Sequence, residues 1–146
     1  MPTVLLVHGP NLNLLGQREP EIYGSATLDD YVRETTRLAE TLGLEVESFQ
    51  SNHEGEIVDL IHGARGRVDA IVVNAGALTH YSWALHDALA TFDGPIIEVH
   101  ISQPNAREPW RHTSVVAPVA SGSIAGFGML GYELAIRAIS SRLSSR

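Results

Sequence analysis

The polar segment GPNLNLLGQREPEIYG (9–24) contains two side chains that can do acid–base chemistry as a pair, Arg18 and Tyr23. A tyrosine normally loses its proton near pH 10, so a tyrosine base at around pH 7 to 8 needs about 3–4 kcal/mol of extra stabilisation of the phenolate. A guanidinium stays charged while the phenol ionises, and either Arg18 or Arg107 could supply that stabilisation. A tyrosine that only anchors its loop is the commoner case, so both interpretations stand at this point.

Arginines concentrate where a binding site is expected. The sequence has ten basic residues, and all of them are arginine. Arg18, Arg107 and Arg111 fall in loops beyond the ends of expected strands, in a chain with a formal net charge of −7. Such a group favours recognition of an anion or a sugar-like polyol. A non-catalytic module that holds a small anionic metabolite is one hypothesis that this pattern leaves open.

Three histidines, His8, His80 and His100, also fall at or just past expected strand ends. Together they could form a catalytic zinc site, which would make the protein a metal-dependent hydrolase or lyase. The sequence has no H-E-x-x-H pair, and histidines in such loops more often form hydrogen bonds or transfer protons. The metal site is therefore the alternative hypothesis.

The composition excludes several chemistries. The sequence contains no cysteine, so disulfides, thiolate nucleophiles and cysteine-ligated metals are absent. It contains no lysine, which excludes a Schiff base on a lysine amine and the lysine of a P-loop. No G-x-S-x-G motif supports α/β-hydrolase chemistry.

The motif Gly126-Phe-Gly128-Met-Leu-Gly131 resembles a dinucleotide fingerprint. That fingerprint needs an acidic residue about 20 positions later, beyond the end of this sequence, so we interpret the glycines as helix–sheet packing positions.

The acidic charge argues against nucleic-acid binding. Glycines, serines and Pro118 interrupt the uncharged stretch 114–132, which argues against a membrane span. The N-terminus lacks the pattern of a signal peptide, and we expect a cytoplasmic protein.

Strands and helices alternate along the sequence. Thr27 with Asp30, and Ser51 with Glu54, read as capping boxes that open two helices, the first of which stops at Gly43. Further helices are expected over 81–92 and 129–143. The alternation predicts an α/β domain over 1–146 with a doubly wound, five-stranded parallel sheet flanked by helices, whose ligands bind beyond the carboxyl ends of the strands. The expected strands are 3–8, 44–50, 70–74, 95–100 and 123–126.

Long blocks of the sequence resemble the type II 3-dehydroquinate dehydratases. The resemblance covers nearly the whole chain, and the blocks come in the family's order. It is carried by GPNLNLLGQREPEIYG (9–24), FQSNHEGEIVDLIH (49–62), NAGALTHYS (74–82), EVHISQPNAREPWRHTS (98–114) and GFGMLGYELA (126–135).

The resemblance implies a flavodoxin-like fold, a homo-oligomer of twelve chains arranged as four trimers, and dehydration of 3-dehydroquinate to 3-dehydroshikimate in the shikimate pathway. It implies no cofactor and no metal. The type I enzymes use a lysine Schiff base for the same conversion, so the absence of lysine independently fits the type II route. The long segment 9–24 would contain a lid over about 17–25 that closes on the substrate.

The resemblance also implies catalytic roles. Tyr23 is expected to remove a C2 proton as a base, with Arg18 holding it as phenolate. Removal of that proton creates an enolate, which a water held by Asn11 would stabilise. His100 is expected to protonate the departing C1 hydroxyl, with Glu98 orienting it.

The implied substrate contacts come from the other matched loops. The backbone N–H groups of Ile101 and Ser102, with the amide of Asn74, are expected to bind the carboxylate. His80 and Arg111 would bind the ring hydroxyls.

Two further residues match the family, and three positions differ from it. Arg107 corresponds to a second arginine near the tyrosine, and Asp87 to an acidic residue that reaches the site of a neighbouring subunit. His8 stands where the family commonly has asparagine, Gln103 replaces a common asparagine, and Trp110 a common phenylalanine. None of these changes touches the expected base, acid or arginines, so we expect an active enzyme.

Overall fold

Five parallel strands form one sheet in the computed structural model, which describes residues 1–17 and 19–145. The order β2-β1-β3-β4-β5 is the flavodoxin-like order, which confirms the predicted fold class. The expected strands agree with the observed ones to within a residue at each end. Their bounds are β1 Thr3–His8, β2 Glu45–Gln50, β3 Ala70–Asn74, β4 Ile96–His100 and β5 Gly122–Ala125.

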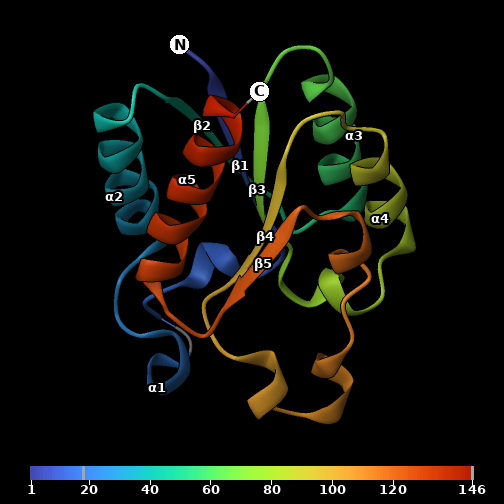
Figure 1. Ribbon diagram of the computed structural model, residues 1–146. Coiled ribbons are helices and arrows are strands. Elements are labelled where there is room, and N and C mark those ends of the chain that lie inside the picture. Colours follow the sequence, from blue (N-terminus) through green and yellow to red (C-terminus); the bar gives the residue numbers. More distant parts are fainter. Residues whose placement is uncertain (18, 146) are drawn as a thin grey trace.

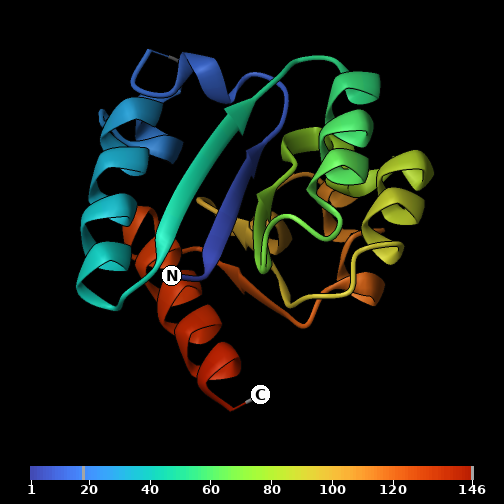
Figure 2. The ribbon, with the colours of Figure 1, turned by 90° about the horizontal axis from the view of Figure 1, so that it is seen from above.

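Helices cover both faces of this sheet (Figures 1 and 2). Helices α2 and α5 pack on one face, and α3 and α4 pack on the other. Successive strand residues point to opposite faces, so Val4 and Leu6 of β1 join the first core while Leu5 and Val7 join the second. The helix bounds are α1 Pro20–Tyr23, α2 Leu28–Thr41, α3 Glu54–Ala64, α4 Trp83–Ala90 and α5 Met129–Ser144.

The predicted capping box at the start of α2 is confirmed. The Thr27 backbone N–H donates to the Asp30 carboxylate at 2.9 Å, and the Asp30 N–H donates to the Thr27 hydroxyl at 3.2 Å. The two bonds satisfy donors that a helix start otherwise leaves unpaired.

The predicted box of Ser51 and Glu54 is wrong. Helix α3 begins at Glu54 itself, and its N-cap is His53. The bond expected from the Ser51 N–H to the Glu54 carboxylate is replaced by tertiary bonds: the Ser51 N–H donates to the His8 carbonyl, and the Glu54 carboxylate accepts from the Ser82 hydroxyl. The Ser51 hydroxyl, expected to accept from the Glu54 N–H, instead accepts from the His53 N–H at 2.9 Å and donates to the Glu56 carboxylate at 2.8 Å.

The segment 9–24 is more ordered than the loop that its sequence indicates. It contains a 3-10 turn at Leu12–Leu14 and the short helix α1, whose first residue is Pro20. Proline suits that position because its missing N–H would have no partner in the first turn. In Figure 1, α1 and the segment after β4 both lie at the carboxyl end of the sheet. Within the described residues, no helix is long and apolar enough to cross a membrane.

The packing interpretation of the glycine motif holds at Gly131. A Cβ atom added there would lie 3.4 Å from Val99 and 3.6 Å from Ile124, so the backbone of α5 rests directly on β4 and β5. Helix α5 continues to Ser144, and in the described residues after Gly131 there is no second strand of the kind a dinucleotide site requires.

Candidate active site

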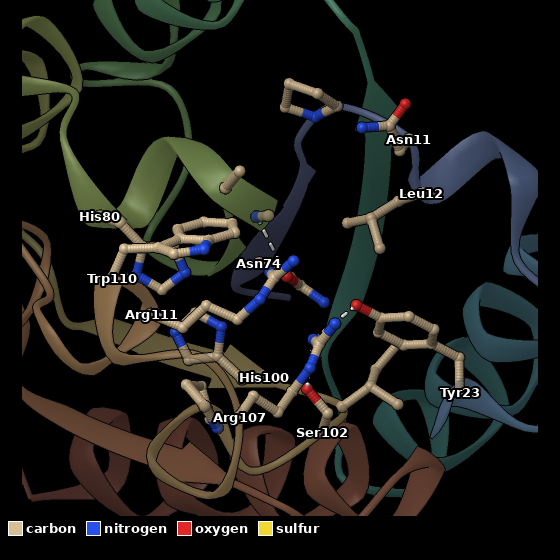
Figure 3. A pocket seen from close by; sticks show the side chains of 15 residues that line it. Asn11, Leu12, Tyr23, Asn74, His80, His100, Ser102, Arg107, Trp110 and Arg111 are labelled. Atoms are coloured by element: carbon tan, nitrogen blue, oxygen red, sulfur yellow. Dashed lines mark hydrogen bonds between the residues drawn. The ribbon is translucent and has the colours of Figure 1, made fainter. Parts of the chain in front are cut away.

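A cavity of about 240 Å³ opens beyond the carboxyl ends of β1, β3 and β4, where the sequence places its binding loops (Figure 3). Nine of the predicted site residues line it. The lining residues are Pro10, Asn11, Leu12, Tyr23, Asn74, Gly76, Ala77, His80, His100, Ile101, Ser102, Pro104, Arg107, Trp110 and Arg111.

The floor of the cavity depends on a close crossing of two loops. A Cβ atom added to Gly9 would lie 2.2 Å from the carbonyl oxygen of Ala75, a distance that no side chain tolerates. Glycine therefore lets the loop after β1 pass directly over the loop after β3, and this brings Asn11 and Asn74 to the same cavity.

Tyr23 meets an arginine at the cavity wall. The Arg107 Nη1 donates to the Tyr23 hydroxyl at 2.7 Å, and the guanidinium carbon lies 5.4 Å from the centre of the tyrosine ring (Figure 3). The tyrosine oxygen therefore lies within hydrogen-bond distance of a positive charge. Arg18, which the resemblance implies holds the tyrosine as phenolate, lies outside the described residues.

Arg107 is buried, and two carboxylates form ion pairs with its guanidinium. Its side chain is 13% exposed, and its nearest carboxylate oxygens, from Glu19 and Glu108, lie 3.7 and 3.9 Å away. Nη1 also donates to the Ser102 hydroxyl at 3.2 Å, while Nε has no hydrogen-bond partner within residues 1–17 and 19–145. Neither carboxylate is within hydrogen-bond distance, so the guanidinium at the cavity wall can also attract an anion.

His100 and Glu98 form a second functional pair. His100 Nε2 donates to the Glu98 carboxylate at 2.6 Å, so Nδ1 is the ring nitrogen left for the cavity. The hydroxyls of Ser114 and Ser123 donate to the two oxygens of the same carboxylate. Burial alone would raise the pKa of Glu98, but the bond and charge of His100 and the serine hydroxyls together lower it. The carboxylate is thus held as an anion that orients the imidazole of His100.

His80 can accept a hydrogen bond in the cavity through its Nε2 atom. Its other ring nitrogen, Nδ1, donates to the Thr113 carbonyl at 2.7 Å. Burial lowers the pKa of His80, and the nearby His100 and Arg111 act in the same direction. A neutral imidazole with a proton on Nδ1 carries a lone pair on Nε2, which can accept a hydrogen bond from a hydroxyl in the cavity.

Arg111 lies over the ring of Trp110, with its guanidinium carbon 4.0 Å from the ring centre. Its Nε donates to Glu108 at 3.0 Å, and its side chain is 15% exposed. The tryptophan that departs from the family pattern therefore fixes a cationic donor group at the cavity wall.

Asn11 and Asn74 reach the cavity from neighbouring strand ends. The Asn11 backbone N–H donates to the Asn52 side chain at 2.9 Å, which ties the loop after β1 to the loop after β2. Asn74 is 4% exposed, and its side-chain oxygen accepts from the Gly76 N–H at 3.3 Å. Ile101 and Ser102 follow β4 directly and line the same wall.

Asp87 does not line this cavity. It lies on α4 with its side chain 81% exposed, and its carboxylate contacts His86 at 2.9 Å. The Asp87 side chain is therefore exposed to solvent on this chain.

The three histidines of the metal hypothesis do not come together. His8 is fully buried and does not line the cavity, because its ring packs against Tyr132 beneath the floor. No group of three or more His, Asp or Glu side chains in residues 1–17 and 19–145 is placed to hold a metal ion. The predicted alternative of a His8–His80–His100 site is wrong for this part of the chain.

Burial lowers the pKa of His8 to about 4, against the opposing bond to the Phe49 carbonyl. Between pH 6.5 and 4 the unfolded chain therefore binds a proton at His8 that the folded chain does not, so the free energy of unfolding falls as the pH falls. We expect this term to cost about 3 kcal/mol on going from pH 7 to pH 4. Urea unfolding of wild type and His8→Asn at both pH values measures it. Between pH 7 and pH 4, the free energy of unfolding of the variant should fall by about 3 kcal/mol less than that of the wild type. Equal falls in the two proteins would contradict a lowered pKa of His8.

Comparisons with known proteins agree with the family that the sequence resembles. The family model described as dehydroquinase class II matches residues 2–140. A 3-dehydroquinate dehydratase of Halalkalibacterium halodurans is 52% identical over 139 residues, covering 95% of this chain and 96% of that protein. A catabolic 3-dehydroquinase 1 of Aspergillus terreus is 57% identical over 134 residues, covering 92% of this chain and 88% of that protein. The crystal structure of a type II dehydroquinase from Propionibacterium acnes matches with a TM-score of 0.93 and 43% identity, covering 97% of each chain.

Sequence reasoning missed one polar residue that contacts the cavity wall. Tyr132 does not line the cavity, but its hydroxyl accepts a hydrogen bond from the Asn74 amide nitrogen at 3.2 Å. In the sequence it is one member of the apolar stripe of a helix, which gives no sign of this contact.

Proposed function

Because the chain belongs to the class II dehydroquinase family, we propose that it eliminates water from 3-dehydroquinate to give 3-dehydroshikimate through an enolate, with no cofactor. The observation that carries the proposal is that Tyr23, bonded to Arg107, and His100, bonded to Glu98, line one cavity. An elimination needs such a division, since one group must take a proton and another must give one.

Tyr23 acts as the base. Its phenolate oxygen takes the C2 proton, and the electrons of the broken C–H bond move onto the ketone oxygen as an enolate. The hydrogen bond from Arg107 at 2.7 Å supports this role, because it places positive charge at the oxygen that must be ionised. Arg18 is the second cation that we assign to the phenolate.

His100 acts as the acid. When the enolate collapses to form the C1–C2 double bond, the C1 hydroxyl leaves and takes the proton of His100 to become water. Glu98, bound to the opposite ring nitrogen at 2.6 Å, supports the protonated imidazole. The cycle closes when the proton gained by Tyr23 is lost and His100 is protonated again.

The other polar groups of the cavity bind the substrate. A water held by Asn11 stabilises the enolate oxygen, and the backbone N–H groups of Ile101 and Ser102, with Asn74, bind the carboxylate. His80 accepts from one ring hydroxyl, and Arg111 donates to another, in keeping with the neutral imidazole and the buried guanidinium.

The segment over about 17–25 closes as a lid on this complex, within a single domain of residues 1–146. The chain assembles as a dodecamer of four trimers in the cytoplasm, and Asp87 contributes to the cavity of a neighbouring subunit. The exposed positions of Asp87 and Trp83 on α4 support a contact there. Light scattering of the purified protein measures this assembly.

Conversion of 3-dehydroquinate to 3-dehydroshikimate by the purified protein tests the proposal, with the product separated by chromatography and identified by mass. We expect complete turnover before and after extended treatment with a strong chelator. Loss of activity on chelation and its return with added Zn²⁺ would favour metal-dependent chemistry. Binding of 3-dehydroquinate without any product would favour a small-anion-binding module, and either outcome would contradict the proposal.

A further inference from the structure

The amide of Asn74 is held at both ends. Its oxygen accepts from the Gly76 N–H at 3.3 Å, and its nitrogen donates to the Tyr132 hydroxyl at 3.2 Å. An amide nitrogen carries two hydrogens, so one remains for the cavity that Asn74 lines. A flipped amide would set its NH₂ group against the Gly76 N–H, so the orientation that presents an N–H to the cavity is the favoured one.

Tyr132 is fixed beneath the cavity floor. It lies on α5 and is 1% exposed. Its ring stacks on His8, with centroids 5.7 Å apart and planes at 13°, and meets Tyr31 edge-on at 5.3 Å. Both neighbouring rings are themselves buried, so the Tyr132 hydroxyl is held at a defined place under the end of β3.

The hydroxyl of Tyr132 stays neutral, in contrast to the role proposed for Tyr23. Burial raises the pKa of Tyr132 above its ordinary value, against the opposing hydrogen bond from Asn74. A neutral phenol can accept the Asn74 N–H, but it takes no proton from a substrate. Tyr132 therefore contributes geometry and no proton transfer.

We infer that Tyr132 is a positioning residue whose hydroxyl holds the Asn74 amide so that its N–H faces the substrate carboxylate. The inference rests on the proposed function, which supplies that carboxylate. Together with the Gly76 N–H, the hydroxyl prevents the amide from rotating away from the cavity, so the donor is already oriented when the substrate arrives.

Tyr132→Phe tests this directly, because it removes only the hydroxyl. We expect KM for 3-dehydroquinate to rise about five- to tenfold, the effect of one neutral hydrogen bond, with kcat within about twofold of wild type. Tyr31→Phe is the matched control, since it removes a hydroxyl from the same ring cluster without a contact to Asn74, and it should leave KM unchanged. Equal changes in both variants would overturn the inference.

A double-mutant cycle separates positioning from a general loss of packing. Asn74→Ala should raise KM at least as much as Tyr132→Phe, and adding Tyr132→Phe to Asn74→Ala should change KM no further. A multiplicative effect in the double variant would overturn the inference. Asn74→Asp gives a check that leaves Tyr132 unaltered: its carboxylate fills the same space but offers the cavity no N–H. Retained affinity in that variant would also overturn the inference.

Equilibrium binding distinguishes failure of this inference from failure of the proposed function. In the Tyr23→Phe background, calorimetry measures the Kd of 3-dehydroquinate with and without Tyr132→Phe, and no turnover is needed. A five- to tenfold weakening supports the positioning role even if the wild type yields no product. Normal turnover by the wild type together with an unchanged Kd would overturn the inference and leave the proposed function standing.

Discussion

Tyr23→Phe is expected to lower kcat for 3-dehydroquinate by about 10²- to 10⁴-fold while the protein stays folded, because it removes the base and leaves the ring. The ring of Tyr23 contributes to packing, but its hydroxyl is the atom that Arg107 contacts at 2.7 Å. A phenylalanine keeps the packing of the ring and loses the hydroxyl that Arg107 contacts. Initial rates followed at the absorbance of the enone product measure the change.

Tyr81→Phe is the control for this variant. Tyr81 is 62% exposed and does not line the cavity, so removal of its hydroxyl should leave kcat within about twofold of wild type. If Tyr23→Phe retains more than a tenth of the wild-type kcat, the proton is removed by another group and the base assignment is wrong.

His100→Ala is expected to have the second large effect, again about 10²- to 10⁴-fold in kcat. Without the imidazole, the C1 hydroxyl must leave without a proton donor, and hydroxide is a poor leaving group. Glu98→Gln removes the carboxylate charge but keeps its shape, so it should lower kcat by less. Added to His100→Ala, it should have no further effect, because the two residues act as one unit.

His62→Ala serves as the control for a lost histidine, since His62 is exposed on α3 and does not line the cavity. We expect it to keep the wild-type kcat. A Glu98→Gln variant that lowers kcat as strongly in the absence of His100 as in its presence would show that the carboxylate does not act through the imidazole.

The strands and most helix boundaries could be predicted because burial and capping are local patterns. Apolar residues in β1 alternate between two cores, and the Thr27–Asp30 box closes within one turn. The Ser51–Glu54 box has the same local signature, yet the Ser51 N–H bonds to His8 and the Glu54 carboxylate bonds to Ser82. The sequence pattern does not reveal these two competing partners, because only the fold brings them close.

The same limit applies to the site. Resemblance and loop position together placed Tyr23, His100 and Arg107 at one cavity. The contact between Tyr23 and Arg107 joins residues 84 positions apart, and the contact between Asn74 and Tyr132 joins residues 58 positions apart. Their distances depend on how the loops and α5 sit on the sheet. His8 is the last residue of β1, as His100 is of β4, but its ring is buried beneath the cavity floor and packs against Tyr132.

The most direct test of the central claim is the initial rate of enone formation from 3-dehydroquinate by chelator-treated, dialysed wild-type protein. A protein that uses Tyr23 as base and His100 as acid needs nothing else, so the account predicts saturable turnover at the rate of the untreated protein. Absence of turnover, or turnover that appears only when a metal or cofactor is added back, would contradict it.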